Sequence, residues 1–541
     1  MTTESVESKQ AQTETGSETN LTVDDSFPYH PLACDIDQTG PWGFIDRSSR
    51  GITEWLNPIL IKEARQSLKS RQFIITFFLL LVASCCWTVL GVVINTPNVY
   101  YLPTGSSMIV GYYFVLAIPV MGMVPLAAHR SLAAEIDDST FEMLSITNLT
   151  SFRIVMGKLN SSVLQMLIYF AAVVPCLAFT FLLRGVDLLT IVYLVVLVTT
   201  VSLLVTTLAL MLATVAASRA GQTMSLLMTM AVILLAEFTC GVIAVESMLY
   251  SNNTLTLEVW VVLGTCILIS VSCMALFVKA AAARIAPVTE NRSTGLRYLM
   301  FLQQVLWVGC IGMLALIDRN SEIIVLGIIV LGGYWLLMGT LMLAESPELS
   351  PRVQRGLPQT FLGRAFLTWF NPGPGTGFVY AVASGIAGVS VLGIFSFAAD
   401  LAVTRAEIPI YTTLIVIGYL AGFLGIIRLI AMPLCHRFGR MFSITIGTLV
   451  TVMILALMAP SIITVLMTGT VSYTYSTIHT LNWGWTLAEV ADRQKYQIFD
   501  ASFIMCVGLI IGAFNLALLF REFDYRRIAV PERVQQDRQG E

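Results

Sequence analysis

The sequence predicts an all-α membrane protein with about 12 transmembrane helices. Of its 541 residues, 56% are hydrophobic and 12% are charged, whereas soluble domains carry roughly 25% charged residues. The apolar residues form runs that each match the roughly 20 residues that a helix needs to cross a bilayer. We therefore expect a polytopic protein that contacts lipid and has no nucleic-acid partner. The predicted spans are 73–95, 107–128, 159–183, 188–216, 223–248, 258–280, 298–317, 322–343, 378–399, 409–433, 441–467 and 501–520.

The basic residues divide unevenly between the two sides of these spans. Loops on the cytoplasmic side of a membrane are enriched in Lys and Arg. If the N-terminus lies inside, Arg428 falls within a span and most of the 31 Lys and Arg residues fall on the inner side. The outer side then holds Arg184, Arg319, Arg405, Arg493 and Lys495. This bias predicts an even number of spans, with both termini in the cytoplasm.

The segment before the first span has the pattern of an amphipathic helix. It reads NPILIKEARQSLKSR from Asn57, and Pro58 suits the first position of a helix. At 3.6 residues per turn, its basic residues share one face and its apolar residues share another. These residues are Lys62, Arg65 and Lys69, and Ile61, Ala64 and Leu68. We expect an interfacial helix within 51–72, with a solvated basic stop before the span as the alternative.

A polar island separates the second and third spans and runs from His129 to Asn160. It carries an ordered series of acidic, aromatic and turn-forming residues. Because a solvated connector needs no such order, we interpret the island as a folded contact surface on the cytoplasmic side. A merely solvated amphipathic connector is the alternative. The candidate contact residues are Glu135, Asp138, Thr140, Phe141, Glu142, Leu144, Arg153, Gly157 and Lys158.

Together, the two segments resemble the permease subunit of type-2, exporter-class ABC transporters, over about residues 57–287. In that family an elbow helix with the pattern N-P-x-x-x-K-E-x-R precedes the first span, and the loop after the second span carries E…T-x-E-x-L-L…G-K. The first motif falls here on Asn57, Pro58, Lys62, Glu63 and Arg65. The second falls on Glu135, Thr140, Glu142, Leu144, Gly157 and Lys158. Ser139, Ser145 and the lack of a mid-loop proline depart from the family pattern.

The resemblance implies a six-span permease domain over 73–287 and a coupling helix near 146–154 that a separate ABC ATPase subunit contacts. It also implies a homo- or heterodimer of permeases in the inner membrane of a bacterium. The phosphate-binding G-x-x-x-x-G-K-[ST] loop is absent, because Phe152 replaces its first glycine and Leu159 follows Lys158. We therefore expect no enzyme activity and no cofactor in this chain, with ATP and Mg²⁺ bound by the partner.

Ionisable residues within spans are candidates for function, because a charge near the bilayer centre costs several kcal/mol. Glu237 lies about midway along the fifth predicted span. It either contacts substrate at a dimer interface or forms a structural hydrogen bond with a neighbouring helix. Arg428 lies toward the inner end of the tenth span, from which its long side chain can reach the lipid phosphates.

Two other classes of function stay open. An ion-coupled secondary transporter would use Glu237 and a proton or sodium gradient. A membrane-embedded transferase would need an acid, a base or a nucleophile clustered at one face, for which His479, Glu489 and Asp492 are the nearest candidates. The cysteine and histidine residues have no ligand spacing, so no metal site is predicted.

The rest of the chain is divided by composition alone. Residues 1–50 are polar at the start, and we expect them to be disordered. The later segments are a two-span continuation, a cytoplasmic Pro/Gly-rich linker, a four-span domain with an outward aromatic loop at 468–500, and a cytoplasmic tail. These cover 288–343, 344–377, 378–520 and 521–541. The sequence WFNP at 369–372 echoes WLNP at 55–58, which would fit a duplication of six spans.

Overall fold

The structure is a computed structural model of the full chain. Apart from residues 185, 288 and 289 and a few isolated positions elsewhere, it describes nine segments of the chain. They are 58–137, 150–215, 219–247, 257–346, 367–399, 407–439, 441–470, 475–492 and 498–522. Every described element is a helix or a connecting turn. The predicted disordered segment and Asn57 lie outside the described residues.

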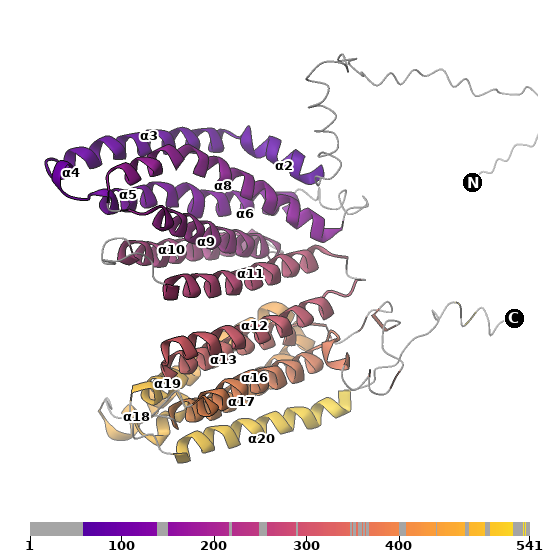
Figure 1. The fold of residues 1–541 in the computed structure, drawn as a ribbon. Coiled ribbons are helices and arrows are strands. Elements are labelled where there is room, and N and C mark those ends of the chain that lie inside the picture. The colour runs from indigo at the N-terminus through magenta and orange to yellow at the C-terminus, as the bar shows by residue number, and fades with distance from the viewer. Residues whose placement is uncertain are drawn as a thin grey trace, which may run out of the picture. The chain divides into compact units, whose positions relative to one another are not determined.

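The first half of the described chain is a bundle of long helices joined by short connections (Figure 1). Its second span is not uniform, because a π-helical turn, η1, separates α5 from α6 and contains Pro119 and Gly122. The elements are α2 (Pro58–Leu68), α3 (Arg71–Ile94), α4 (Asn98–Tyr101), α5 (Gly105–Ala117), η1 (Ile118–Met123), α6 (Val124–Asp137), α8 (Ser151–Leu182), α9 (Leu188–Val215), α10 (Arg219–Val245) and α11 (Leu257–Ile285).

The second half begins with α12, and the described part of the predicted aromatic loop at 468–500 includes two short helices, η4 and α19. The elements are α12 (Thr294–Asp318), α13 (Ser321–Leu343), η3 (Thr368–Phe370), α16 (Pro374–Ala398), α17 (Glu407–Phe438), α18 (Met441–Thr468), η4 (Thr477–Leu481), α19 (Trp483–Asp492) and α20 (Ile498–Glu522). Both α12 and α13 pack against α16, and α13 also packs against α17. Helix α13 therefore packs with the later spans, whereas α12 packs against both α11 of the first half and α16 of the second.

The predicted fold class is confirmed, because the described residues contain 12 helices that are long and apolar enough to cross a membrane. Several spans are longer than predicted. The second runs over Gly105–Asp137 and the third over Ser151–Leu182, where the sequence predicted 107–128 and 159–183. The helices continue into polar sequence because their backbone hydrogen bonds are satisfied internally whatever the side chains are.

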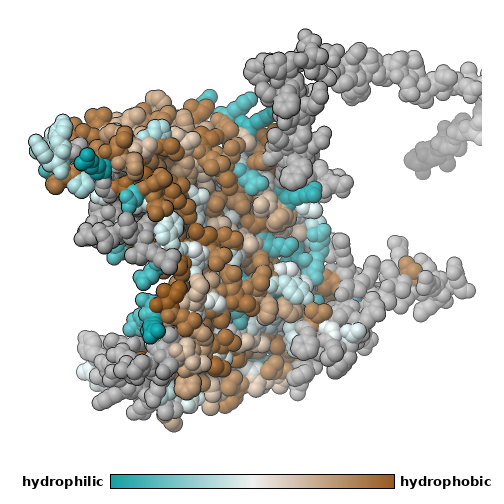
Figure 2. Space-filling view, viewed as in Figure 1, coloured by the Kyte–Doolittle hydropathy of each residue, from teal (hydrophilic) through white to brown (hydrophobic). Residues whose placement is uncertain are grey.

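Apolar side chains form both the interior of the helix bundles and much of their flanks. One buried cluster centres on Tyr112, Met121 and Val173 in the first half, and another centres on Trp335, Phe378 and Leu424 in the second. Figure 2 shows hydrophobic residues along the flanks of the helices and hydrophilic residues near their ends. An apolar flank of this kind is the surface expected of helices that lie in lipid.

Glycines allow α17 and α20 to pack with their backbones in contact. Gly418 of α17 faces Gly508 of α20, where a Cβ atom on Gly508 would overlap the carbonyl group of Gly418. Gly422 also lies against Gly508, and Gly425 lies against Ile511. Small residues at such spacings are typical of close helix pairs in membranes, where apolar burial gives no preference for protein over lipid.

Replacing Gly508 with Ala should destabilise the protein by about 1–3 kcal/mol, because the helices must separate to admit the new methyl group. The midpoint of thermal unfolding in detergent measures the effect. Gly447→Ala in α18 is the matched control, since a Cβ atom there meets nothing within 4 Å. An equal midpoint for the two variants would contradict the close packing of α17 against α20.

Candidate functional site

A buried lysine joins three helices at the end of the first bundle that carries α2. Lys158, near the start of α8, lies 3.2 Å from Oε1 of Glu63 on α2 and 3.1 Å from Oε2 of Glu135 on α6. Its Nζ also donates a hydrogen bond of 2.8 Å to Oγ of Ser131 on α6. We call these four residues the Lys158 network.

The helices place the members of the Lys158 network by their periodicity. Ser131 and Glu135 are four residues apart on α6 and so lie on one face of that helix. On α2, which packs against α8, Glu63 is buried while its neighbours Lys62 and Arg65 are exposed. The hydroxyl of Ser131 also donates to Oε2 of Glu63, at 3.3 Å, which closes the network between α2 and α6.

The network places one positive and two negative charges in a small volume that solvent hardly reaches. The side chain of Lys158 is 2% exposed, that of Glu63 is 9% exposed and that of Glu135 is 18% exposed. Lys62 lies at the solvent edge, 3.7 Å from Oε1 of Glu135, with 62% of its side chain exposed. Breaking a buried ion pair by removing one partner is costly because the remaining charge stays buried without compensation. The network therefore holds α2 against α6 and α8.

A polar cavity of about 200 Å³ adjoins the Lys158 network. It lies between α2, the start of α3, α6 and α8, and most of the residues that line it carry a hydroxyl, amide or charged group. Among them are Ser67, Ser161 and Gln165, and the first two lie 3.3 Å apart through their Oγ atoms. A cavity with this lining suits ordered water better than an apolar ligand.

The structure brings together predicted residues from both sequence motifs. Glu63 comes from the first motif, and Glu135 and Lys158 come from the second. Gly157 is buried beside Lys158 in α8, whereas Arg65 and Arg153 are exposed. Pro58 begins α2. Asp138, Thr140, Phe141, Glu142 and Leu144 lie outside the described residues.

The predicted coupling helix at 146–154 falls partly within the described chain. Helix α8 begins at Ser151, after Thr150, whose side chain accepts a hydrogen bond from the backbone N–H of Arg153. Such an N-cap fixes where a helix starts. From Ser151, the helix continues without a break through Lys158 into the third span. Residues 151–154 are thus part of the same helix as that span.

Glu237 lies on α10 beside the π-helical turn of the second span. Its Oε1 is the nearest atom to the position that a Cβ would take on Gly122, at 3.1 Å. The hydroxyl of Tyr113 donates to the backbone carbonyl of Glu237 at 3.4 Å. Glu237 is half-buried and lines an open groove together with residues of α10 and Phe114 of α5.

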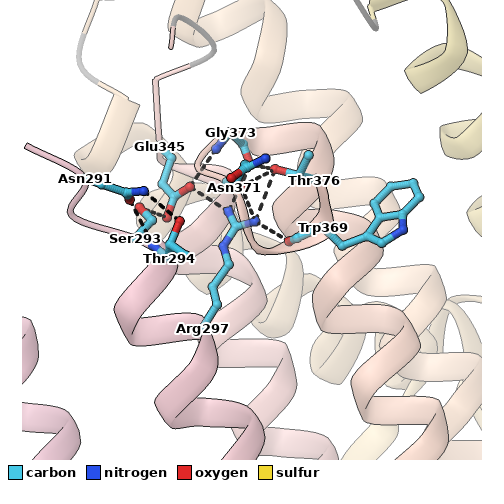
Figure 3. A network of polar contacts seen from close by, with 9 residues as sticks. All are labelled: Asn291, Ser293, Thr294, Arg297, Glu345, Trp369, Asn371, Gly373 and Thr376. Carbon is cyan, nitrogen blue, oxygen red and sulfur yellow. Dashed lines mark hydrogen bonds and ion pairs between the residues drawn. The ribbon is translucent and has the colours of Figure 1, made fainter. Parts of the chain in front are cut away.

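A second buried cation lies one residue before the predicted seventh span and organises the start of α16 (Figure 3). Arg297 of α12 is 1% exposed, and its guanidinium points into the turn that precedes α16. It donates to the carbonyl oxygens of Trp369 and Gly373, at 2.7 and 3.3 Å, and pairs with Glu345 at 2.7 Å. Pro/Gly-rich turns leave backbone carbonyl groups without helical hydrogen-bond partners. The Pro/Gly-rich sequence before α16 could therefore have indicated that a buried side chain donates hydrogen bonds to it.

Gly373 takes a backbone conformation that glycine favours within this turn. Its φ of 141° is one that residues with a Cβ rarely adopt. Its N–H donates to Oε2 of Glu345 at 2.8 Å, and Ser293 donates to Oε1 of the same carboxylate at 2.7 Å. The end of the Pro/Gly-rich linker, just before α16, is therefore fixed by one arginine and one glutamate.

Two other residues singled out from the sequence have structural roles. Arg428 is buried, 4% exposed, and donates to the carbonyl of Asn515 at 2.9 Å, so the expectation that it reaches lipid phosphates is wrong. His479 is also buried, with its Nδ1 2.8 Å from Oγ of Ser476 and its Nε2 3.4 Å from Oγ1 of Thr464. Hydroxyl groups thus occupy both nitrogens of the histidine considered for a transferase site.

The chain was also compared with known proteins. No model of a protein family matches it, and none of the curated proteins matches it significantly. Within the described residues, no three His, Cys, Asp or Glu side chains gather as a metal site requires. The 12 apolar helices among the described residues indicate an integral membrane protein. Its function must be inferred from the Lys158 network and the sequence motifs.

Replacing Lys158 with Met should destabilise the protein by about 3–5 kcal/mol, because it leaves Glu63 and Glu135 without their counter-charge. Thermal unfolding of the purified protein in detergent measures this loss. Lys62→Met is the control and should cost about 1 kcal/mol or less, since an exposed ion pair contributes little. Adding Glu63→Gln to Lys158→Met should recover part of the loss. A Lys158→Met variant as stable as the unchanged protein would show that the network does not hold the three helices.

Proposed function

We propose that this chain is the membrane-spanning permease subunit of an ABC exporter, driven by ATP that a separate ATPase subunit hydrolyses. The observation that carries the proposal is the Lys158 network. Three positions of the family motifs, Glu63, Glu135 and Lys158, form one cluster of ion pairs although 95 residues separate the first from the last. Two unrelated solvated segments would have no reason to share a buried lysine.

The network gives the segment between α6 and α8 a mechanical role. This segment, 138–149, is flanked by the end of α6 and the start of α8, which the network ties to each other and to α2. A force applied to the segment therefore reaches three helices together. Helices transmit such a force as levers because their hydrogen bonds are internal. In this proposal, α2 is the elbow helix, and the ATPase subunit grips 138–154 on the cytoplasmic side.

The second span connects this end of the bundle to Glu237. His129 lies on α6 two residues before Ser131 of the network, and its Nε2 is 2.9 Å from Oγ of Ser225 on α10. Further along the same span, the π-helical turn lies beside Glu237 of α10. π-helical turns within α-helices frequently occur at functional sites. We infer that movement of α6 changes the position of α10, with substrate passing between two permeases of a dimer.

The proposal requires a partner that hydrolyses ATP, and the requirement is testable on the native complex. The tagged chain should purify from its own membranes with an ATPase that carries the Walker motifs, and the complex should hydrolyse ATP. Replacing Phe141 and Leu144 together with Ala should reduce that activity by about tenfold or more, because a few anchoring side chains carry most of the binding energy of a protein interface.

Replacing Tyr100 and Tyr101 with Ala provides the matched control. Both are highly exposed on α4, at the opposite end of the first bundle from α2 (Figure 1). The control pair should leave the co-purified ATP hydrolysis unchanged. Transport by the purified chain alone, driven by a proton or sodium gradient, would overturn the proposal in favour of an ion-coupled transporter that uses Glu237.

A further inference from the structure

An open groove of about 450 Å³ lies on the flank of the first bundle, between α5 and α10. Its walls are mainly apolar and include Phe114 of α5 and Phe238, Val242 and Val245 of α10. Its volume is within the range of about 300–1,000 Å³ that is typical of small-molecule sites. Since these helices are apolar spans, the groove faces the lipid or a partner within the membrane.

Two carboxyl groups interrupt this apolar lining. Glu237 and Glu246 both line the groove, and no basic residue does. They are nine residues apart, which corresponds to about 13 Å along a helix. A carboxyl group that faces hydrocarbon without a cationic partner is costly. The groove is therefore complementary in charge to a cation rather than to an anion or a neutral lipid chain.

The two phenylalanines add a second feature that favours a cation. Phe114 is 52% exposed and Phe238 is 70% exposed, and both rings line the groove beside the carboxyl groups. The face of an aromatic ring attracts a cation, most strongly where water is excluded. Aromatic rings combined with carboxyl groups in an apolar groove would bind a cation whose substituents are themselves apolar.

We propose that the groove between α5 and α10 binds a lipophilic cation, meaning a bulky apolar molecule with one delocalised or quaternary positive charge. Gly122 supports this assignment, because its lack of a side chain lets the Glu237 carboxyl lie against the second span. An acyl chain would fill the groove but leave both carboxyl groups without a partner. A second copy of the chain, docked symmetrically, would bring like carboxyl groups together. The claim that lipophilic cations are the exporter's substrates rests on the proposed function. The claim that the groove binds such a cation does not.

Binding of tetraphenylphosphonium to the full chain in lipid nanodiscs tests the inference directly. Tetraphenylborate has the same shape and the opposite charge, and empty nanodiscs correct for partition of either ion into lipid. We expect saturable binding of tetraphenylphosphonium and none of tetraphenylborate. Glu237→Gln should weaken the binding by about tenfold or more, since charge interactions are strong where water is scarce. Glu322→Gln, at an exposed carboxylate in the first turn of α13, is the matched control and should leave binding unchanged.

Three results would overturn the inference. The first is equal saturable binding of both ions, and the second is unchanged affinity for tetraphenylphosphonium in Glu237→Gln. The third is a Phe238→Cys variant that forms a disulfide between two copies of the chain and, once cross-linked, no longer binds tetraphenylphosphonium. The last result would identify the groove as an interface between copies. The assay contains no ATPase, so its failure is distinct from failure of the exporter proposal. Saturable, Glu237-dependent binding without any co-purified ATPase would support the site and contradict the exporter.

Discussion

The ammonium group of Lys158 is the constraint on which the first bundle depends. It is 2% exposed, and an isolated charge at such a depth is so costly that the protein must supply a counter-charge. The counter-charges come from two other helices, Glu63 on α2 and Glu135 on α6. The ion pairs that compensate the charge of Lys158 therefore fix α2 against the ends of α6 and α8. A short amphipathic helix that would be marginal alone is held at a defined place by these ion pairs together with the burial of Ile59.

The second half uses a buried arginine for a different task. Arg297 is paired with Glu345, but it also donates to backbone carbonyls of the turn before α16. A planar guanidinium with five donors suits several carbonyl acceptors at once, whereas an ammonium group acts as a compact point charge. Lys158 thus joins side chains of separate helices, while Arg297 shapes a stretch of backbone. Within the described residues, the Lys158 and Arg297 networks differ in their partners and in their roles. They therefore add no support for the duplication that the echo between WLNP and WFNP would fit.

The sequence predicted the class and the number of spans, because bilayer thickness limits the length of apolar runs. It did not predict where the helices end, since α6 and α8 continue past the apolar residues to Asp137 and from Ser151. It named Glu63, Glu135 and Lys158 as parts of two motifs but not as partners. Pairing depends on helix rotation and packing, which periodicity alone leaves undetermined. Arg428 was misjudged for the same reason, since its partner, Asn515, lies 87 residues further along the chain.

The central claim is that Lys158 fastens α2 to α6 and α8, and hydrogen exchange of the α2 backbone measures that fastening most directly. In the unchanged protein, amides of Ile59–Leu68 should exchange slowly, and Lys158→Met should raise their exchange rate by about tenfold or more while leaving α13 unaffected. Exchange in α2 that is equally fast with and without Lys158 would contradict the account.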